Sequence, residues 1–277
     1  MNFKINVSRI FLYLCVLLLV LYSVGPFIWI LISSLGLEKD IFSSSPSIFP
    51  KHFTFVNYTN LFNDTYFVNF LLNSIYVTIG TIFIGIVIAT LAAYSLTRFN
   101  YPGRNLFSIF SLFAYMLPSV LLVLPLYLFA VNLRLTDKLI GLIFAYIALG
   151  LPYCIWMMKA FFQSIPIEYE ESAFIDGASR LRTLFSIVIP ISLPGIIATT
   201  VFLFVLVWNE YLFALVFLSS DSKMTFPVGL QSFISPHFIY WDYILSASVL
   251  VSIPALIVFL ITQKALIKGW GAGGIKG

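Results

Sequence analysis

Long apolar runs constrain this chain more than any other feature of its sequence. Six of them are long enough to cross a lipid bilayer, at approximately residues 10–32, 70–97, 106–130, 139–162, 187–218 and 244–266. A helix rises about 1.5 Å per residue, so about 20 residues cross a hydrocarbon core of about 30 Å. Lipid cannot hydrogen-bond an exposed backbone, and a spanning segment of this length must therefore be helical. The sequence predicts an all-α, polytopic membrane protein with six transmembrane helices.

The charged residues are few and lie mainly between these runs. They make up 9% of the chain, against 61% hydrophobic residues and a mean hydropathy of +1.03. The net charge of +4 could indicate nucleic-acid binding in a soluble protein. Here the positions of the charges favour a role in membrane orientation, so we expect membrane lipid and no nucleic acid as a partner.

Lys and Arg predict the orientation, because cytoplasmic loops of membrane proteins are enriched in both. If both termini are cytoplasmic, the external side holds Lys39, Lys51, Arg134, Lys138 and Lys223, and the cytoplasmic side holds the other ten of the 15 basic residues. The expected organisation is a transmembrane helix with an external segment over residues 1–69, a core of five transmembrane helices over 70–266, and a flexible cytoplasmic tail over 267–277.

Catalytic and metal sites find no support in the sequence. Cys15 and Cys154 both lie inside apolar runs, which is typical of buried small hydrophobic residues, and His52 and His237 are far apart. A G-x-G-x-x-G string at Gly269, Gly271 and Gly274 follows no predicted strand, so it does not indicate a nucleotide site. We expect no enzyme activity and no cofactor.

One cytoplasmic segment, Glu168 to Pro190, is unusually rich in charge for this chain. Its first residues include three glutamates, which favour the positive end of a helix, and Gly177 can end that helix in a left-handed conformation. The pattern predicts a short helix, a turn and a second helix that enters the membrane. Such a structured loop suggests a docking element, although a helix lying on the lipid surface is the alternative.

The same segment resembles the EAA motif of ABC importer permeases. That motif reads E-A-A, three residues, G, nine residues and I-x-L-P, and here it falls on Glu171, Ser172, Ala173, Gly177, Ile187, Ile189 and Pro190. Ser172 replaces an alanine and Ile189 replaces a leucine. Stretches such as "AAYSLTRF", "MLPSVLLVLPLYLF", "VWNEYLFAL" and "IKGWGAGGIKG" are similar to those of maltose-type carbohydrate permeases, so the resemblance covers nearly the whole chain.

The resemblance implies a type I ABC importer permease fold in the plasma membrane of a prokaryote. It implies four kinds of partner: a second homologous permease subunit, two ATP-binding cassette ATPase subunits, a solute-binding protein and a sugar. The loop over residues 163–186 would dock on an ATPase, with Glu171 as a polar contact, Ala173 as a small residue allowing close approach, and Gly177 as the turn. ATP would be hydrolysed by the separate ATPase subunits.

The transport path has fewer candidates, and they lie together in the fifth run. Glu210 is an acidic residue deep in a predicted span, where a charge costs roughly 2.5–3.5 kcal/mol. We therefore expect it to face the protein interior, either in a packing hydrogen bond with Asn209 or as part of the path with Trp208, Asn209 and Tyr211. No Lys or Arg lies deep in a span, which favours a neutral di- or oligosaccharide.

Three alternatives stay open at this point. A secondary transporter or channel would work without an ATPase, and a membrane-embedded enzyme would need a catalytic cluster. An ABC permease for a glycerol phosphate-type solute is the third. The first two leave the spacing of the EAA motif unexplained.

Overall fold

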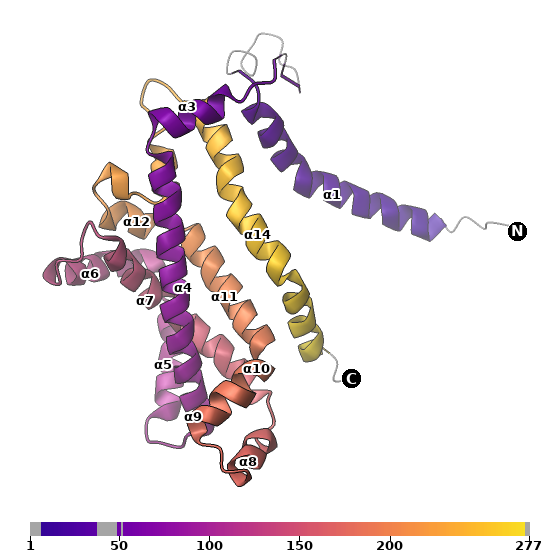
Figure 1. The fold of residues 1–277 in the computed structure, drawn as a ribbon, viewed down its shortest axis with the longest axis vertical. Coiled ribbons are helices and arrows are strands. Elements are labelled where there is room, and N and C mark those ends of the chain that lie inside the picture. Colours follow the sequence, from indigo (N-terminus) through magenta and orange to yellow (C-terminus); the bar gives the residue numbers. More distant parts are fainter. Residues whose placement is uncertain (1–6, 38–48, 51, 275–277) are drawn as a thin grey trace, which may run out of the picture. The chain divides into compact units, whose positions relative to one another are not determined.

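The computed structural model describes residues 7–37, 49–50 and 52–274 of the 277-residue chain, and side chains between residues 11 and 265. The described residues are helical apart from loops and an isolated bridge between Ile234 and Ile239. The α-helices are α1 (Val7–Ser34), α3 (Val56–Asp64), α4 (Phe67–Arg98), α5 (Arg104–Met116), α6 (Ser119–Asn132), α7 (Leu139–Gln163), α8 (Glu168–Ile175), α9 (Arg180–Thr183), α10 (Ile189–Ile191), α11 (Leu193–Trp208), α12 (Leu212–Phe217), α13 (Phe226–Gln231) and α14 (Trp241–Gly274). A π-helix, Leu184–Val188, joins α9 to α10, and a 3₁₀ turn covers Asp221–Lys223. Figure 1 shows the ribbon with most of the α-helices labelled.

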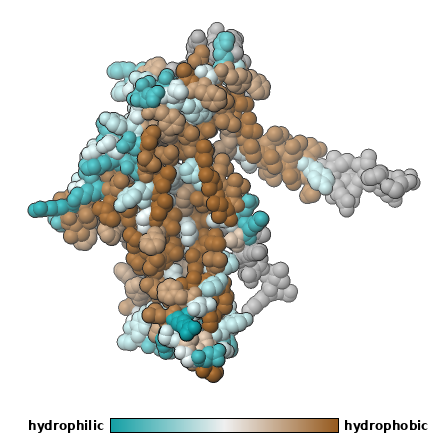
Figure 2. Space-filling view, viewed as in Figure 1, coloured by the Kyte–Doolittle hydropathy of each residue, from teal (hydrophilic) through white to brown (hydrophobic). Residues whose placement is uncertain are grey.

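Four described helices are long and apolar enough to cross a membrane unaided: α1, α4, α7 and α14. Two bent pairs bring the number of candidate spans to six if each pair is one span. Apolar side chains cover the sides of the long helices in Figure 2. The all-α class and the expected spans are confirmed, but two of the spans are broken.

The first break separates α5 from α6 with a bend of 104°. Pro118 lies at the break and has no backbone N–H to continue the helix. Proline also forces the residue before it out of the helical conformation, and Leu117 is extended at φ −67° and ψ 132°. The second break, of 76°, separates α9–α10 from α11 at Ser192, where Pro190 and Pro194 flank the bend.

The chain forms two compact units, each described here by itself. The first contains residues 1–68 and 229–253. Within it, Asn57 at the start of α3 is buried, and its amide donates to the carbonyl oxygens of Ser34 and Gly36 at 2.9 and 2.8 Å. These bonds satisfy carbonyl groups that the end of α1 leaves without helical partners.

The second unit contains residues 69–228 and 254–277, and its core is built around α7. That helix packs most extensively against α5 and α11. Glycine permits the close approach of α7 and α11: a Cβ at Gly195 would lie 2.3 Å from the Phe161 ring, and one at Gly150 would lie 2.4 Å from Leu203. Small residues at helix contacts are typical of membrane bundles.

Most of the expected tail over residues 267–277 is helical. Helix α14 continues to Gly274, so the glycines of the G-x-G-x-x-G string lie in a helix. Residues 275–277 lie outside the described part of the chain.

Candidate coupling and transport sites

Helix α8 ends in a complete Schellman motif centred on Gly177. The Gly177 N–H donates to the Phe174 carbonyl at 3.0 Å, and the Ala178 N–H donates to the Ala173 carbonyl at 2.9 Å. Gly177 has φ +81°, a left-handed conformation that glycine adopts without penalty. The prediction that α8 ends at a left-handed Gly177 is therefore confirmed.

The next helix, α9, begins at Arg180, three residues after Gly177. Ser179 caps α9, because its Oγ accepts a hydrogen bond from the Arg182 N–H at 3.3 Å. Arg180 lies over the Phe99 ring at 4.9 Å from its centroid, and also near Phe174 at 5.8 Å. The predicted arrangement of a short helix, a turn and a second helix is therefore present. Hydrogen bonds cap the end of α8 and the start of α9, and Arg180 packs against the loop that follows α4.

Two adjacent glutamates of α8 face different surroundings. Glu171 is exposed, whereas Glu170 is 2% exposed and forms an ion pair with Arg98 at the end of α4. The Tyr94 hydroxyl donates to the other Glu170 oxygen at 2.9 Å, and Arg98 also donates to the Ile165 carbonyl at 3.1 Å. Helix α8 is consequently bound to the end of α4 by a buried, hydrogen-bonded charge pair.

The other residues of the motif are divided between surface and interior. Ser172 is exposed and its hydroxyl donates to the Glu168 carbonyl, while Pro190 is also exposed. Ala173 is 7% exposed within this subunit. Its small side chain packs α8 onto its own chain, and the close approach of another protein at this helix stays a prediction. Ile187 is partly buried and lies in the π-helix.

Glu210 lies in the break between α11 and α12. Its carboxylate accepts the Tyr146 hydroxyl at 2.7 Å and the backbone N–H groups of Phe213 at 2.9 Å and Ala214 at 3.2 Å. The glutamate therefore caps α12 from within the protein, as expected for an acidic group in a span. The expected bond with Asn209 is wrong, because the Asn209 amide donates to the Val205 carbonyl at 2.9 Å.

The neighbours of Glu210 do not form one surface. Trp208 is 4% exposed, stacks on Phe204 and contacts Phe226 at 4.9 Å between ring centroids. Asn209 and Tyr211 are exposed. The structure thus brings Glu210 together with Tyr146 instead of with an open aromatic face.

A second charged site lies outside the spans, between α6 and α7. Asp137 accepts hydrogen bonds from the Lys223 ammonium and the Ser220 hydroxyl, both at 2.7 Å, and from the Ser219 N–H at 3.0 Å. These donors, Lys223 foremost, hold the pKa of the Asp137 carboxyl well below its usual range. Asp137 therefore fixes the loop that follows α12.

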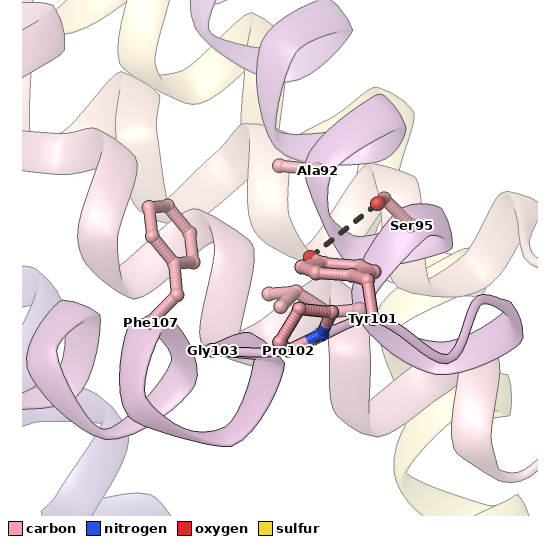
Figure 3. Close-up of a pocket in the computed structure, with 7 residues that line it drawn as sticks. Ala92, Ser95, Tyr101, Pro102, Gly103 and Phe107 are labelled. Atoms are coloured by element: carbon pink, nitrogen blue, oxygen red, sulfur yellow. Dashed lines mark hydrogen bonds between the residues drawn. The ribbon is translucent and has the colours of Figure 1, made fainter.

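The turn between α4 and α5 borders a cavity of about 420 Å³. Figure 3 shows the Tyr101 ring pointing toward Ser95, while the Phe107 ring lies on the other side. Gly103, at φ +86°, permits this turn. The cavity has no charged side chain in its lining, so it is not a candidate ion-binding site.

Sequence reasoning missed Glu170, Arg98 and Tyr94. Glu170 was one of three glutamates whose presence the helix dipole already explained. Arg98 and Tyr94 lie more than seventy residues earlier. The signal available in the sequence was Arg98, a charged residue at the cytoplasmic end predicted for the second span.

Comparison with known proteins gives consistent results. Residues 81–271 match the family model described as binding-protein-dependent transport system inner membrane component. The chain is 33% identical to the inner membrane ABC transporter permease protein YcjP of Escherichia coli strain K12, over 99% of both chains. It is 35% identical to the trehalose/maltose transport system permease protein MalG of Thermococcus litoralis, over 98% of both. A chain in the crystal structure of a bacterial ABC transporter involved in the import of the acidic polysaccharide alginate shares the fold, with a TM-score of 0.80, 23% identity and coverage of 96% of this chain and 100% of that one.

Proposed function

Because the chain belongs to the family of binding-protein-dependent transport system inner membrane components, we propose that it is one permease subunit of an ATP-driven carbohydrate importer. Its cargo is a neutral di- or oligosaccharide, delivered by an extracytoplasmic solute-binding protein. A second homologous permease completes the path, and two ATPase subunits supply the energy. Both termini lie in the cytoplasm of a prokaryotic cell, as the distribution of Lys and Arg favours.

The structure of α8 and its attachment to α4 support the proposal that this subunit couples to an ATPase. The helix exposes Glu171, ends at the left-handed Gly177, and is tied to α4 through Glu170. An element that is exposed on one side and rigidly attached on the other can transmit a movement of a bound ATPase into a transmembrane helix. Closure of the ATPase dimer would rotate the helices and change access from one side of the membrane to the other.

The carbohydrate part is supported by the relative named for trehalose and maltose and by the charges of the spans. Among the described residues, basic side chains lie at or beyond the ends of spans, except for Lys159, which lies about one turn inside the end of α7 and donates to the Ser108 hydroxyl. The Glu210 carboxylate repels an anion, although protein donors already surround it. A glycerol phosphate-type solute is therefore the less favoured cargo.

Uptake by the whole complex tests this assignment. The two permeases and the ATPases are reconstituted in proteoliposomes with the binding protein. Uptake of trehalose and maltose is then compared with that of glycerol 3-phosphate and maltose 1-phosphate at matched concentrations. We expect ATP-dependent import of a neutral sugar, and preferred import of a phosphate ester would refute the neutral cargo.

A further inference from the structure

The turn between α4 and α5 borders two adjoining depressions with different linings. The cavity of about 420 Å³ described above is mostly apolar, with Ala92 of α4 and Phe107 of α5 in its walls (Figure 3). The second depression, of about 590 Å³, is lined by residues 100–106, and Arg104 is its charged member. The two depressions share Tyr101, Pro102 and Gly103. A charged surface therefore adjoins an apolar one at this turn.

The Arg104 side chain has hydrogen-bonding capacity that the protein leaves unused. Its Nη1 atom donates to the Phe99 carbonyl at 3.0 Å and to the Asn100 side-chain oxygen at 2.8 Å. Within the described part of the chain, its Nε and Nη2 atoms donate to no other residue. These two atoms form one edge of the guanidinium, and such an edge binds a phosphate through two parallel hydrogen bonds. That edge is available to an anionic ligand.

Lys159 adds a second positive charge to the same face of α5. Arg104 and Ser108 are four residues apart on this helix, so their side chains are neighbours. The Lys159 ammonium donates to the Ser108 hydroxyl at 2.6 Å. Among the residues that the structure describes, neither of these two basic side chains forms an ion pair with a carboxylate. The protein itself therefore does not compensate the two charges.

The position of this turn indicates which anion it meets. Helix α4 ends at Arg98 and α5 begins at Arg104, so the turn lies where two candidate spans reach a membrane surface. Anionic lipids attract basic residues at the cytoplasmic surface, and basic pockets between transmembrane helices bind their headgroups. A free anion would need only the charged depression, whereas the apolar depression beside it suits a ligand that also has an apolar part.

We propose that this turn binds one anionic phospholipid, whose phosphate accepts hydrogen bonds from Arg104. The Lys159 ammonium, one turn along the same face, adds to the attraction for the phosphate. The ester groups and first methylenes of the lipid occupy the apolar depression and pack on Phe107. This site goes beyond the proposed function, because it depends on neither the cargo nor the ATPase.

Lipid binding to the assembled complex tests the charged half of the site. The delipidated complex is titrated with dioleoyl phosphatidylglycerol, and the bound lipids are counted by native mass spectrometry. Arg104→Gln and Lys159→Gln should each weaken the tightest lipid site of this chain about fivefold. Lys264→Gln is the matched control, because Lys264 is an exposed basic residue of α14 on the same predicted side of the membrane. It should leave this site unchanged.

A second pair of variants tests the apolar half without altering any charge. Phe107 and Phe110 are both exposed phenylalanines of α5, at 50% and 66%, but only Phe107 lines the apolar depression. Phe107→Ala should weaken the site roughly fourfold, as expected for the loss of about 30 Å² of apolar contact. Phe110→Ala should leave it unchanged.

Three results would overturn the lipid site. Equal phosphatidylglycerol binding by the native complex and by the Arg104→Gln/Lys159→Gln variant would show that the two charges hold no lipid. Equally tight binding of dioleoyl phosphatidylcholine would show that the site does not select an anion. Displacement of phosphatidylglycerol by an excess of inorganic phosphate would show an ion site without a lipid. None of these results bears on the cargo, which sugar uptake tests separately.

Discussion

Glu170 and Glu171 are neighbours in sequence, yet one is buried in an ion pair and the other faces the surroundings of the protein. Substitutions should therefore affect them in different ways. Removing the charge of Glu170 leaves Arg98 without its partner inside the protein. Reversing the charge of Glu171 alters only the exposed surface of α8.

Glu171→Lys should reduce coupling without reducing stability. The expected loss of solute-stimulated ATP hydrolysis by the assembled complex is about tenfold, equivalent to about 1.4 kcal/mol of contact energy. Glu168→Lys is the matched control, because Glu168 is also an exposed glutamate of α8. Equal stimulation in the native and Glu171→Lys complexes would contradict the docking role.

Glu170→Gln should instead destabilise the subunit, by about 3–5 kcal/mol, because it leaves a buried charge uncompensated. Thermal unfolding of the purified complex measures this loss. The double variant Arg98→Gln/Glu170→Gln should lose less than the sum of the two single variants, since it removes both charges. Strict additivity would mean that the two side chains do not stabilise one another.

The lowered pKa of Asp137 allows a prediction of how the loop after α12 responds to acid. Its pKa is depressed in the folded protein, so its contribution to stability is complete above the unfolded value of about 3.9 and is lost only as pH falls through the lower folded value. Hydrogen exchange of residues 217–224 should therefore stay slow from pH 7 to pH 4, after correction for intrinsic rates. Asp137→Asn should speed it at every pH, and opening of the native loop with a midpoint near pH 4 would contradict this.

At the scale of elements, the turn between α8 and α9 depends on one backbone conformation. Gly177 and Gly103 both have positive φ, and a Cβ would meet no atom within 4 Å at either position. Alanine at either site should therefore cost about 1–2 kcal/mol through its backbone alone. Both variants should show similar stability, but only Gly177→Ala should lower solute-stimulated ATP hydrolysis. Equal loss of stimulation in both would show that the α8 turn has no special role.

The elements also show what the sequence could predict. The spans and the α8 turn follow from local patterns: apolar length, a glycine stop and glutamates at a helix start. The sharpness of the bend at Pro118 does not, because proline alone permits anything from a mild kink to a complete break. The partners of Glu170 and Glu210 depend on residues far away in sequence, so no local pattern could reveal them.

At the scale of the whole molecule, the chain has the features of one part of an assembly. The side chains of α1 described in its apolar window are not buried within this chain, and no Walker A sequence occurs in its 277 residues. Contact of α1 with lipid accounts for its exposed apolar side chains, and hydrolysis of ATP by separate subunits accounts for the second observation. A secondary transporter or channel would need neither the exposed motif of α8 nor its rigid attachment to α4.

ATP-dependent uptake of radiolabelled trehalose or maltose into proteoliposomes tests this account most directly. It is measured for the complete complex, for the complex without this chain, and for this chain alone under an imposed sugar gradient. The account predicts ATP-dependent import by the complete complex and none by either of the other two preparations. Gradient-driven sugar flux by this chain alone would contradict it.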